Sequence, residues 1–373
     1  MRIESIVMRQ VRMQLLEPFV TSYGAETHKE AVIVEARTEA GAVGYAECVA
    51  AGTPHYTEET SITAWHVLKE WLIPSVFGRG FDSVNHLVRW LEDQNYIRGN
   101  RMAKAGLEMA LWDAFAAETS TPLAALLGGS RTEVAVGISV GLQPATDLLV
   151  EKVARYVSQG FQRVKLKVEP LRDFEIVSAV RAAFPTLPIM VDANSAYAGC
   201  TYEDLRWLDD YDLMMIEQPL SHDDLVFHAE LARHLKTPVC LDESIKSAED
   251  VRRAGLIGSC RVVNVKAGRV GGFSEVLRIH AEAKNSGMTL WCGGMLETGI
   301  GRLHNVALSS LSGFSLPGDT GPSSRYFAED IVSPPVEFSR PGWLPVERIC
   351  GVSGRVDKAT LEACTVYKET FLP

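Results

Sequence analysis

The stretch VKLKVEPLRDFEIVSAVRAAFPTLPIMVDAN, residues 164–194, contains a short β-rich run, an amphipathic helical segment and a second β-rich run. This order is typical of a β-α-β unit with parallel strands. The same alternation of β-rich runs and helical segments recurs on both sides of the stretch. The β-rich runs lie at 134–140, 164–168, 189–194, 213–219, 239–244, 262–268 and 288–294, with a weaker eighth at 314–319. Eight such units in about 190 residues predict an α/β fold with a (β/α)8 barrel.

The first third of the chain has a different pattern. Alternating apolar residues over 2–15 and 31–50 predict three antiparallel strands, with a turn at Ala40-Gly41. Helical periods follow, and Thr57, Asp82 and Asn100 are the expected N-caps of three helices. We therefore expect an α+β capping domain at 1–130, the barrel at 131–324, and a tail at 325–373 that returns to the capping domain.

Composition excludes several classes of function. The 373 residues are 46% hydrophobic and 23% charged, as in a globular protein. The net charge is −10 and the basic residues form no run, so we expect no nucleic-acid partner. No apolar stretch approaches the ~18 residues of a membrane helix, and the N-terminus lacks a signal-peptide pattern. Seven scattered cysteines without a C-x-x-C pair predict reduced thiols and a cytoplasmic protein.

Ionisable residues follow five successive predicted strands at a nearly fixed interval. They are Lys167, Asp192, Glu217, Asp242 and Lys266, separated by 25, 25, 25 and 24 residues. Because the carboxyl ends of barrel strands line one mouth, these side chains should share one small volume. An acidic residue after a strand is usually a helix cap, and that interpretation is preferred for either aspartate considered singly. Five residues in phase, two of them lysines expected to be buried, favour an active site.

The residue types in this set indicate a chemistry. Three carboxylates in one volume repel one another unless a cation lies between them, and ligation by oxygen alone suits Mg²⁺ better than Zn²⁺. Lys167 and Lys266 lie on the flanking strands, where two amines could remove and return an α-proton. Lys165 points the same way as Lys167 because it lies two residues earlier. The set thus predicts formation of an enediolate from a carboxylate substrate, stabilised by a divalent metal.

Taken together, the motifs resemble those of the enolase superfamily. The resemblance spans nearly the whole chain, through GLEMALWDAFAAETSTPLAALLGG at 106–129 and then VKLKV, VDAN, IEQP, LDES and NVKAGRVGG. The K-x-K of the second barrel strand and the lysine of the sixth are similar to the muconate lactonizing enzyme subgroup. The His-Asp pair of mandelate racemase-like members is absent.

The resemblance implies roles for the site residues. Asp192, Glu217 and Asp242 would be the Mg²⁺ ligands, and Lys167 and Lys266 the acid/base catalysts. The implied supporting and substrate-contacting residues are Lys165 as an electrostatic partner, Asn194 and Glu243 beside the metal shell, Ser139, Gly294 and Met295 on the substrate, and Phe19, Tyr23 and Tyr56 in loops that cover the mouth. Packing in the core is the alternative interpretation for these three aromatic residues. No nucleotide cofactor is expected, since 293–301 lacks the order of a dinucleotide-binding turn.

Two stretches narrow the resemblance to one branch. GISVG at 137–141 and GGMLETGIGRLHN at 293–305 look most similar to the o-succinylbenzoate synthase and N-acylamino acid racemase branch. Dipeptide epimerases usually carry Asp-x-Asp on the last strand to hold the ammonium group of the substrate. Here Asp319 is followed by Thr320 and Gly321, so an uncharged, N-acylated nitrogen fits better.

The resemblance therefore implies racemization of N-succinyl amino acids, dehydration to o-succinylbenzoate in menaquinone biosynthesis, or both. A dipeptide epimerase and a cycloisomerase are the alternatives among enzymes, and a catalytically silent barrel is the alternative of a different class. The expected partners are a small carboxylate substrate and further copies of the chain, because symmetric homo-oligomers are the default for such barrels.

Overall fold

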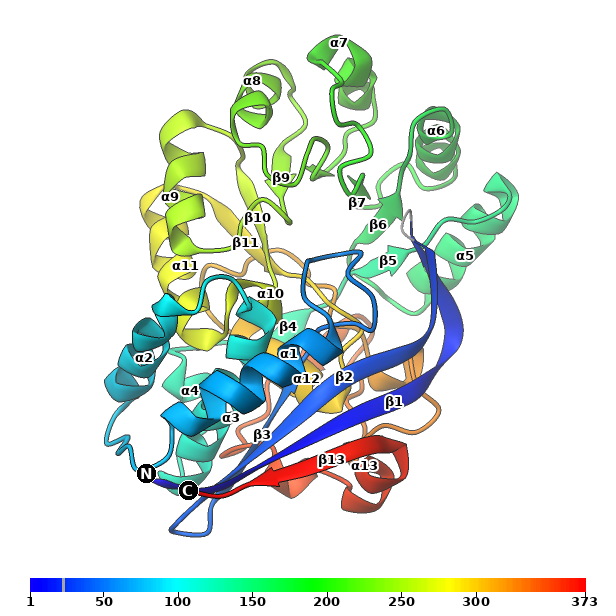
Figure 1. Cartoon of the computed structure of the whole chain (residues 1–373). Coiled ribbons are helices and arrows are strands. Elements are labelled where there is room, and N and C mark those ends of the chain that lie inside the picture. Colours follow the sequence, from blue (N-terminus) through cyan, green and yellow to red (C-terminus); the bar gives the residue numbers. More distant parts are fainter. Residues whose placement is uncertain (22–23) are drawn as a thin grey trace.

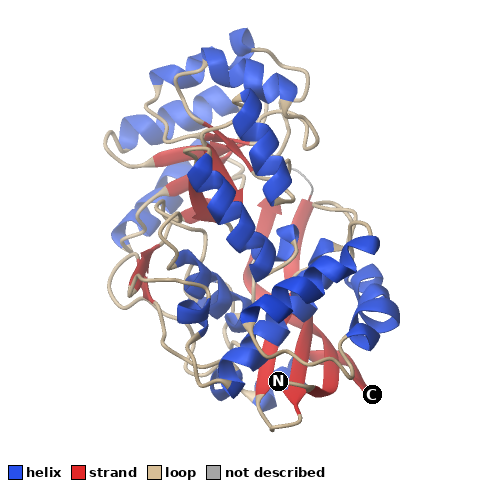
Figure 2. Cartoon of the chain, turned by 90° about the vertical axis from the view of Figure 1, so that its left-hand side faces the viewer, coloured by secondary structure: helices blue, strands red, loops and turns tan. Residues whose placement is uncertain are grey.

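The computed structural model describes residues 1–21 and 24–373, so Tyr23 lies outside the described residues. An antiparallel sheet with its covering helices forms one end of the molecule, and a parallel sheet ringed by helices forms the other (Figure 1). Figure 2 shows the same two parts with the strands of the parallel sheet enclosed by helices. Among the described residues, no helix combines the length and apolar character needed to cross a membrane.

The antiparallel sheet belongs to the capping part. Its order is β13-β1-β2-β3, with bounds Ile3–Thr21 for β1, Gly24–Thr38 for β2, Val43–Cys48 for β3 and Thr365–Phe371 for β13. The three predicted N-terminal strands are thus confirmed. The tail supplies the fourth strand, since Phe371 pairs with Ile6, and both termini lie beside this sheet (Figure 1).

Helices α1 (Ser61–Val67), α2 (Val84–Asp93) and α3 (Arg101–Glu118) follow the sheet. Asn100 is the N-cap of α3 as predicted, but two other predicted caps are wrong. The first helix begins after Thr60, whose hydroxyl accepts from the Thr63 N–H in a reciprocal capping box. The second begins after Ser83.

Within residues 1–21 and 24–373, the barrel contains seven parallel strands in chain order. They are β5 (Ile138–Val140), β6 (Val164–Lys167), β7 (Ile189–Asp192), β8 (Ile216–Glu217), β9 (Val239–Leu241), β10 (Val262–Val265) and β11 (Thr289–Cys292). The helices after them are α5 (Thr146–Ser158), α6 (Asp173–Ala183), α7 (Tyr202–Leu205), α8 (Val226–His234), α9 (Ala248–Ile257), α10 (Ala267–Val270) with α11 (Phe273–Asn285), and α12 (Gly299–Ser309).

Two predicted strands differ from the structure. The run 134–140 divides into β4 (Glu133–Ala135), which pairs antiparallel with β12 (Trp343–Pro345), and β5. The predicted eighth strand at 314–319 is only two isolated parallel bridges, Phe314 to Leu290 and Gly318 to Val136. Pro317 has no N–H for a ladder, which accounts for the interruption. The two bridges connect the segment to β11 and to Val136, which lies between β4 and β5.

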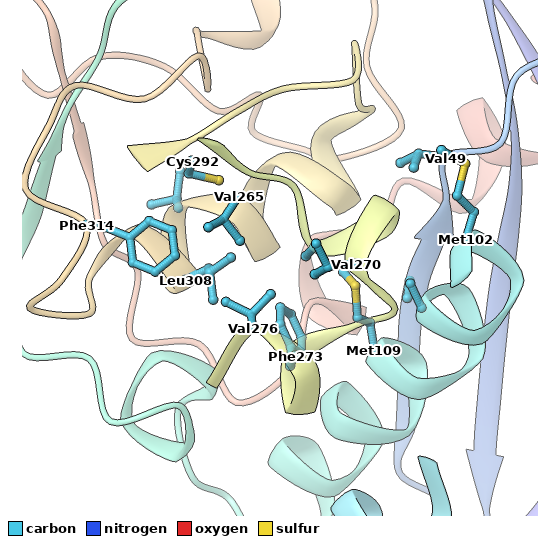
Figure 3. Close-up of a cluster of buried hydrophobic side chains, with 14 of the residues drawn as sticks. Val49, Met102, Met109, Val265, Val270, Phe273, Val276, Cys292, Leu308 and Phe314 are labelled. Carbon is cyan, nitrogen blue, oxygen red and sulfur yellow. The ribbon is translucent and has the colours of Figure 1, made fainter. Parts of the chain in front are cut away.

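A continuous core joins the barrel to the cap. Figure 3 shows buried side chains extending from Cys292 and Val265 on barrel strands, past Phe273 on α11, to Met109 on α3 of the cap. The Glu108 carboxylate reinforces this contact by accepting hydrogen bonds from the Phe273 and Ser274 N–H groups at 2.8 and 2.9 Å. Burial raises the pKa of Glu108 to about 7. The cap is therefore fixed over the barrel by packed side chains and by a buried carboxylate.

Candidate active site

A cavity of about 490 Å³ lies where the cap covers the carboxyl ends of the barrel strands. Eleven of the residues selected from the sequence line it, and they come from both parts of the chain: Phe19, Tyr56, Ser139, Lys165, Lys167, Asp192, Asn194, Lys266, Gly294, Met295 and Asp319. Glu217, Asp242 and Glu243 are buried but do not line the cavity. The structure therefore brings the predicted set together at one place.

Strand register explains why the charged residues meet on one side. Lys167 pairs with Asp192 across β6 and β7, and Asp192 pairs with Glu217 across β7 and β8. The Lys167 Nζ lies 2.7 Å from Asp192 Oδ2 and also bonds Asn194 Oδ1. Asn194 in turn donates to Glu243 Oε1 at 2.9 Å. This end of the site is a continuous chain of amine, amide and carboxylate groups.

Lys165 lies at the centre of the carboxylates. Its Nζ is 3.2 Å from Asp192 Oδ2, 3.1 Å from Glu217 Oε2 and 2.9 Å from Asp319 Oδ2. Burial lowers the pKa of Lys165, but the three carboxylates raise it more, so this pKa is above its usual range. Lys165 is consequently a fixed positive charge in the floor of the cavity.

The opposite side of the site is built around Lys266, which directly follows β10 and caps α10. Its Nζ donates to Asp242 Oδ2 and to the Tyr56 hydroxyl, both at 2.8 Å. Arg269, one turn further along α10, forms an ion pair with Asp242 and donates to the Tyr56 hydroxyl at 3.0 Å. Burial lowers the pKa of Lys266, but Tyr56 and nearby glutamates raise it above its usual range.

The donor set can be tested for its fit to a divalent cation. The side chains of Asp192, Glu217 and Asp242 are at most 1% exposed, follow adjacent strands and offer only oxygen atoms. In addition, Glu243 Oε2 is buried without a hydrogen-bond partner. As they stand, the carboxylates are turned to the lysines and Arg269, and among described residues no three acidic, His or Cys side chains converge closely enough to hold a metal. The chemistry of the donors fits a hard cation, which would replace part of this ammonium charge.

Asp319 is held by three groups at the far end of the barrel sheet. Arg163 Nη1 lies 2.8 Å from Oδ1, while the Ser139 hydroxyl and Lys165 Nζ are each 2.9 Å from Oδ2. The pairing with Arg163 and Lys165 overcomes the effect of burial and holds the pKa of Asp319 below its usual range. The Trp291 ring packs beneath the Arg163 and Lys165 cations, with distances of 4.8 and 4.9 Å to the ring centroid.

The cover of the cavity depends on a contact between the cap and the loop after β11. Lys29 of β2 donates to the Met295 carbonyl at 2.9 Å and lies 3.3 Å from Glu47 Oε1. Glu47 Oε2 also accepts from the N–H and hydroxyl of Thr298, at 2.9 and 2.7 Å. Burial raises the pKa of Glu47 despite the nearby Lys29. We call Lys29 and Glu47 the cap latch, because they fix the segment that carries Gly294 and Met295.

Several site residues were missed by sequence reasoning. They are Arg163, Arg269, Lys29, Glu47 and Arg302, the last of which also lines the cavity. Arg269 lies in the NVKAGRVGG motif, three residues after Lys266 and hence one helical turn away, so helix spacing could have identified it. The cap latch had no such signal, because Lys29 and Met295 are 266 residues apart.

Comparison with known proteins assigns the family. Residues 148–359 match the enolase C-terminal domain-like family, and residues 2–128 match the N-terminal domain of the mandelate racemase / muconate lactonizing enzyme family. The chain belongs to the enolase superfamily. The superfamily membership and the fold class predicted from the sequence are thereby confirmed.

Similar members of the superfamily match over nearly the whole chain. The o-succinylbenzoate synthase of Geobacillus kaustophilus is 46% identical over 99% of this chain and 97% of the synthase. The N-succinylamino acid racemase of Thermus thermophilus is 42% identical over 99% of this chain and 98% of the racemase. The solved structure of an enolase superfamily member from Listeria innocua has a TM-score of 0.95 and 43% identity, covering 100% of this chain and 99% of that one.

Proposed function

We propose that this enolase superfamily member removes the α-proton of a carboxylate substrate, racemizing N-succinyl amino acids, dehydrating a cyclohexadiene precursor to o-succinylbenzoate, or both. The observation that carries the proposal is that Lys167 and Lys266 line one cavity from opposite ends of the row of carboxylates. A pair of amines on two sides of one carbon is what transfer of an α-proton between faces requires. Relatives named o-succinylbenzoate synthase and relatives named N-succinylamino acid racemase support the proposal.

We also propose Mg²⁺ as the cofactor, held by Asp192, Glu217 and Asp242. Its support is the buried set of oxygen donors on adjacent strands. When bound, the ion would stabilise negative charge that develops on the substrate carboxylate. Lys165 would add a fixed positive charge on the floor of the same cavity, because its pKa lies above the usual range.

The two reactions share their first step and then diverge. In racemization, one lysine removes the proton from the α-carbon and the other delivers a proton to the opposite face. In the dehydration, Lys167 would remove the α-proton and then give it to the departing β-hydroxyl, while Lys266 stays cationic.

The surroundings of Asp319 favour an N-acylated substrate over a free amine. Both oxygens of this carboxylate are already engaged, by Arg163 on one and by Ser139 and Lys165 on the other. A substrate ammonium group would have to displace Lys165 to bind there. Turnover of a dipeptide should therefore be slow.

The test compares kcat/KM for N-succinylphenylalanine, the cyclohexadiene precursor of o-succinylbenzoate, and an alanine-containing dipeptide, all with Mg²⁺. We expect measurable values for either or both of the first two substrates and a much lower value for the dipeptide. A dipeptide value well above the other two would contradict the assigned substrate class while leaving α-proton removal intact.

Two further expectations stay proposals. A cytoplasmic location is supported by the seven cysteines, all of which are free thiols. Assembly into a homo-oligomer rests on the general behaviour of such barrels, and size-exclusion chromatography with light scattering would test it.

A further inference from the structure

A second cleft lies between the cap and the barrel, with a volume of about 520 Å³. Its walls come from the end of α2 and the start of α3 on the cap side, and from the β9-α9 loop and the end of α10 on the barrel side. It shares no lining residue with the active-site cavity. This junction cleft has no part in the proposed reaction.

The junction cleft gathers basic residues although the whole chain has a net charge of −10. Five basic and three acidic side chains line it. The three acids are already paired: Glu92 and Glu275 with Arg278, and Glu249 with Arg252 and Arg253. In contrast, Arg98, Arg101, Lys104 and Lys246 have no carboxylate oxygen within 4.0 Å among the residues that the structure describes. Four cations without a direct ion pair among the described residues therefore line one cleft.

Two of these cations are arranged at a cost to stability. Lys104 is 7% exposed, and among the described residues the Ile97 carbonyl is the one hydrogen-bond partner of its Nζ. Arg101 lies three residues earlier on α3 and so on the same helix face. Burial and the charge of Arg101 lower the pKa of Lys104 by more than the nearby Glu59 raises it. A buried lysine beside an unpaired arginine is an arrangement that packing alone would avoid, whereas an anion between them would stabilise it.

The position of the cations also restricts the ligand. Arg98, Arg101 and Lys104 approach from the cap, and Lys246 approaches from the barrel. A ligand that contacts both sides must offer several anionic oxygens over a short distance. The volume admits a small molecule but not a folded partner.

We propose that the junction cleft binds a small oxyanion with two or more negative charges, bridging Arg101 of the cap and Lys246 of the barrel. This inference is independent of the proposed function, because it involves none of the residues of the active site. Binding would add charge-assisted hydrogen bonds across the boundary between cap and barrel, and so should raise the temperature of unfolding.

The test is a calorimetric titration of the full chain with pyrophosphate and, separately, with citrate, at low ionic strength and without divalent metal. These two probes distinguish a phosphate group from a carboxylate group as the source of the charge. We expect saturable binding of at least one probe, at one site per chain, with an increase in Tm. Arg101→Gln and Lys246→Gln should each weaken binding at least tenfold and remove the increase in Tm.

Two control variants show whether binding depends on the junction cleft or on cationic residues elsewhere in the chain. Arg206→Gln removes an exposed arginine that pairs with Glu203 on the barrel surface, and it should bind as the unmodified chain does. Lys167→Ala changes the active site and should also leave the binding intact. The proposal is overturned if neither probe binds, if Lys167→Ala abolishes the binding, or if both cleft variants, folded by circular dichroism, bind with unchanged affinity.

Discussion

The barrel side and the cap side of the active-site cavity are built in different ways. On the barrel side, residues from successive strand ends form a dense ionic network in which Lys165 alone contacts three carboxylates. On the cap side, Phe19 lines the cavity, and Lys29 and Glu47 fix the loop after β11 that carries Gly294 and Met295. We infer that different residues control proton transfer and the choice of substrate. Changes on the barrel side should abolish proton transfer, whereas changes on the cap side should alter which substrates are used.

The largest effect is expected from the two lysines. Lys167→Ala should reduce racemization of N-succinylphenylalanine by about 10³-fold or more, because one face of the α-carbon loses its acid/base group. Exchange of the α-proton of one enantiomer with deuterium should continue through Lys266, and Lys266→Ala should show the converse. Proton NMR in D2O measures both. Lys358→Ala, which changes an exposed lysine of the tail, is the control, and racemization near the unmodified rate in either active-site variant would show that the two-base assignment is wrong.

Metal dependence should give the next largest effect. Exhaustive chelation should abolish turnover and Mg²⁺ should restore it. Asp242→Asn should raise the Mg²⁺ concentration for half-maximal activity by about 10²-fold, because a neutral amide replaces a charged ligand. Activity against Mg²⁺ concentration is the measurement, with chemical denaturation as a check that the variant folds. Full activity after chelation would contradict the metal proposal.

The cap latch should affect substrate binding more than chemistry. Lys29→Met removes the bond to the Met295 carbonyl, so we expect KM for N-succinylphenylalanine to rise about tenfold while kcat changes less than threefold. Hydrogen exchange of residues 293–298 should become faster. Lys29→Met alone leaves the Glu47 carboxylate buried without its cation, which could prevent folding. The double variant Lys29→Met/Glu47→Gln removes that buried charge and is the second variant to be measured. Lys29→Arg should have a KM close to that of the unmodified chain. If kcat of Lys29→Met falls as much as KM rises, the cap latch takes part in the chemical step instead.

The smallest effect should come from a change near the last strand. A side chain at Gly321 would meet Tyr326 at ordinary contact distance, 3.6 Å, so Gly321→Asp should fold. Arg302 donates to the Gly321 carbonyl and stacks on Tyr326, so it would neutralise part of the new charge. We expect kcat/KM for a dipeptide to rise only a few-fold relative to the N-succinyl substrate. Gly321→Asn is the uncharged control, and an equal rise in that variant would exclude charge as the cause.

The barrel side was predictable from the sequence and the cap side was not. An interval of one β-α unit places Lys167, Asp192 and Glu217 on neighbouring strands. Parallel pairing of these strands then brings the three side chains together, independently of the exact bounds of the intervening helices. The cap latch depends on a contact between residues 266 positions apart, which no local pattern encodes. The weak eighth strand failed for a local reason, because Pro317 interrupts the ladder. The proposed limits of the three segments stay a prediction.

The pairing of β13 with β1 has a consequence for the order of synthesis. Ile6 pairs with Phe371, so the edge strand of the cap sheet is translated after every barrel unit. Barrel units can pair with their neighbours as they leave the ribosome, but β1 keeps one open edge until β13 has been translated. Unpaired strand edges recruit strands from other chains. A ribosome that stalls before Thr365 therefore produces a polypeptide that contains all barrel units but has an unpaired β1 edge, which can pair with strands of other chains.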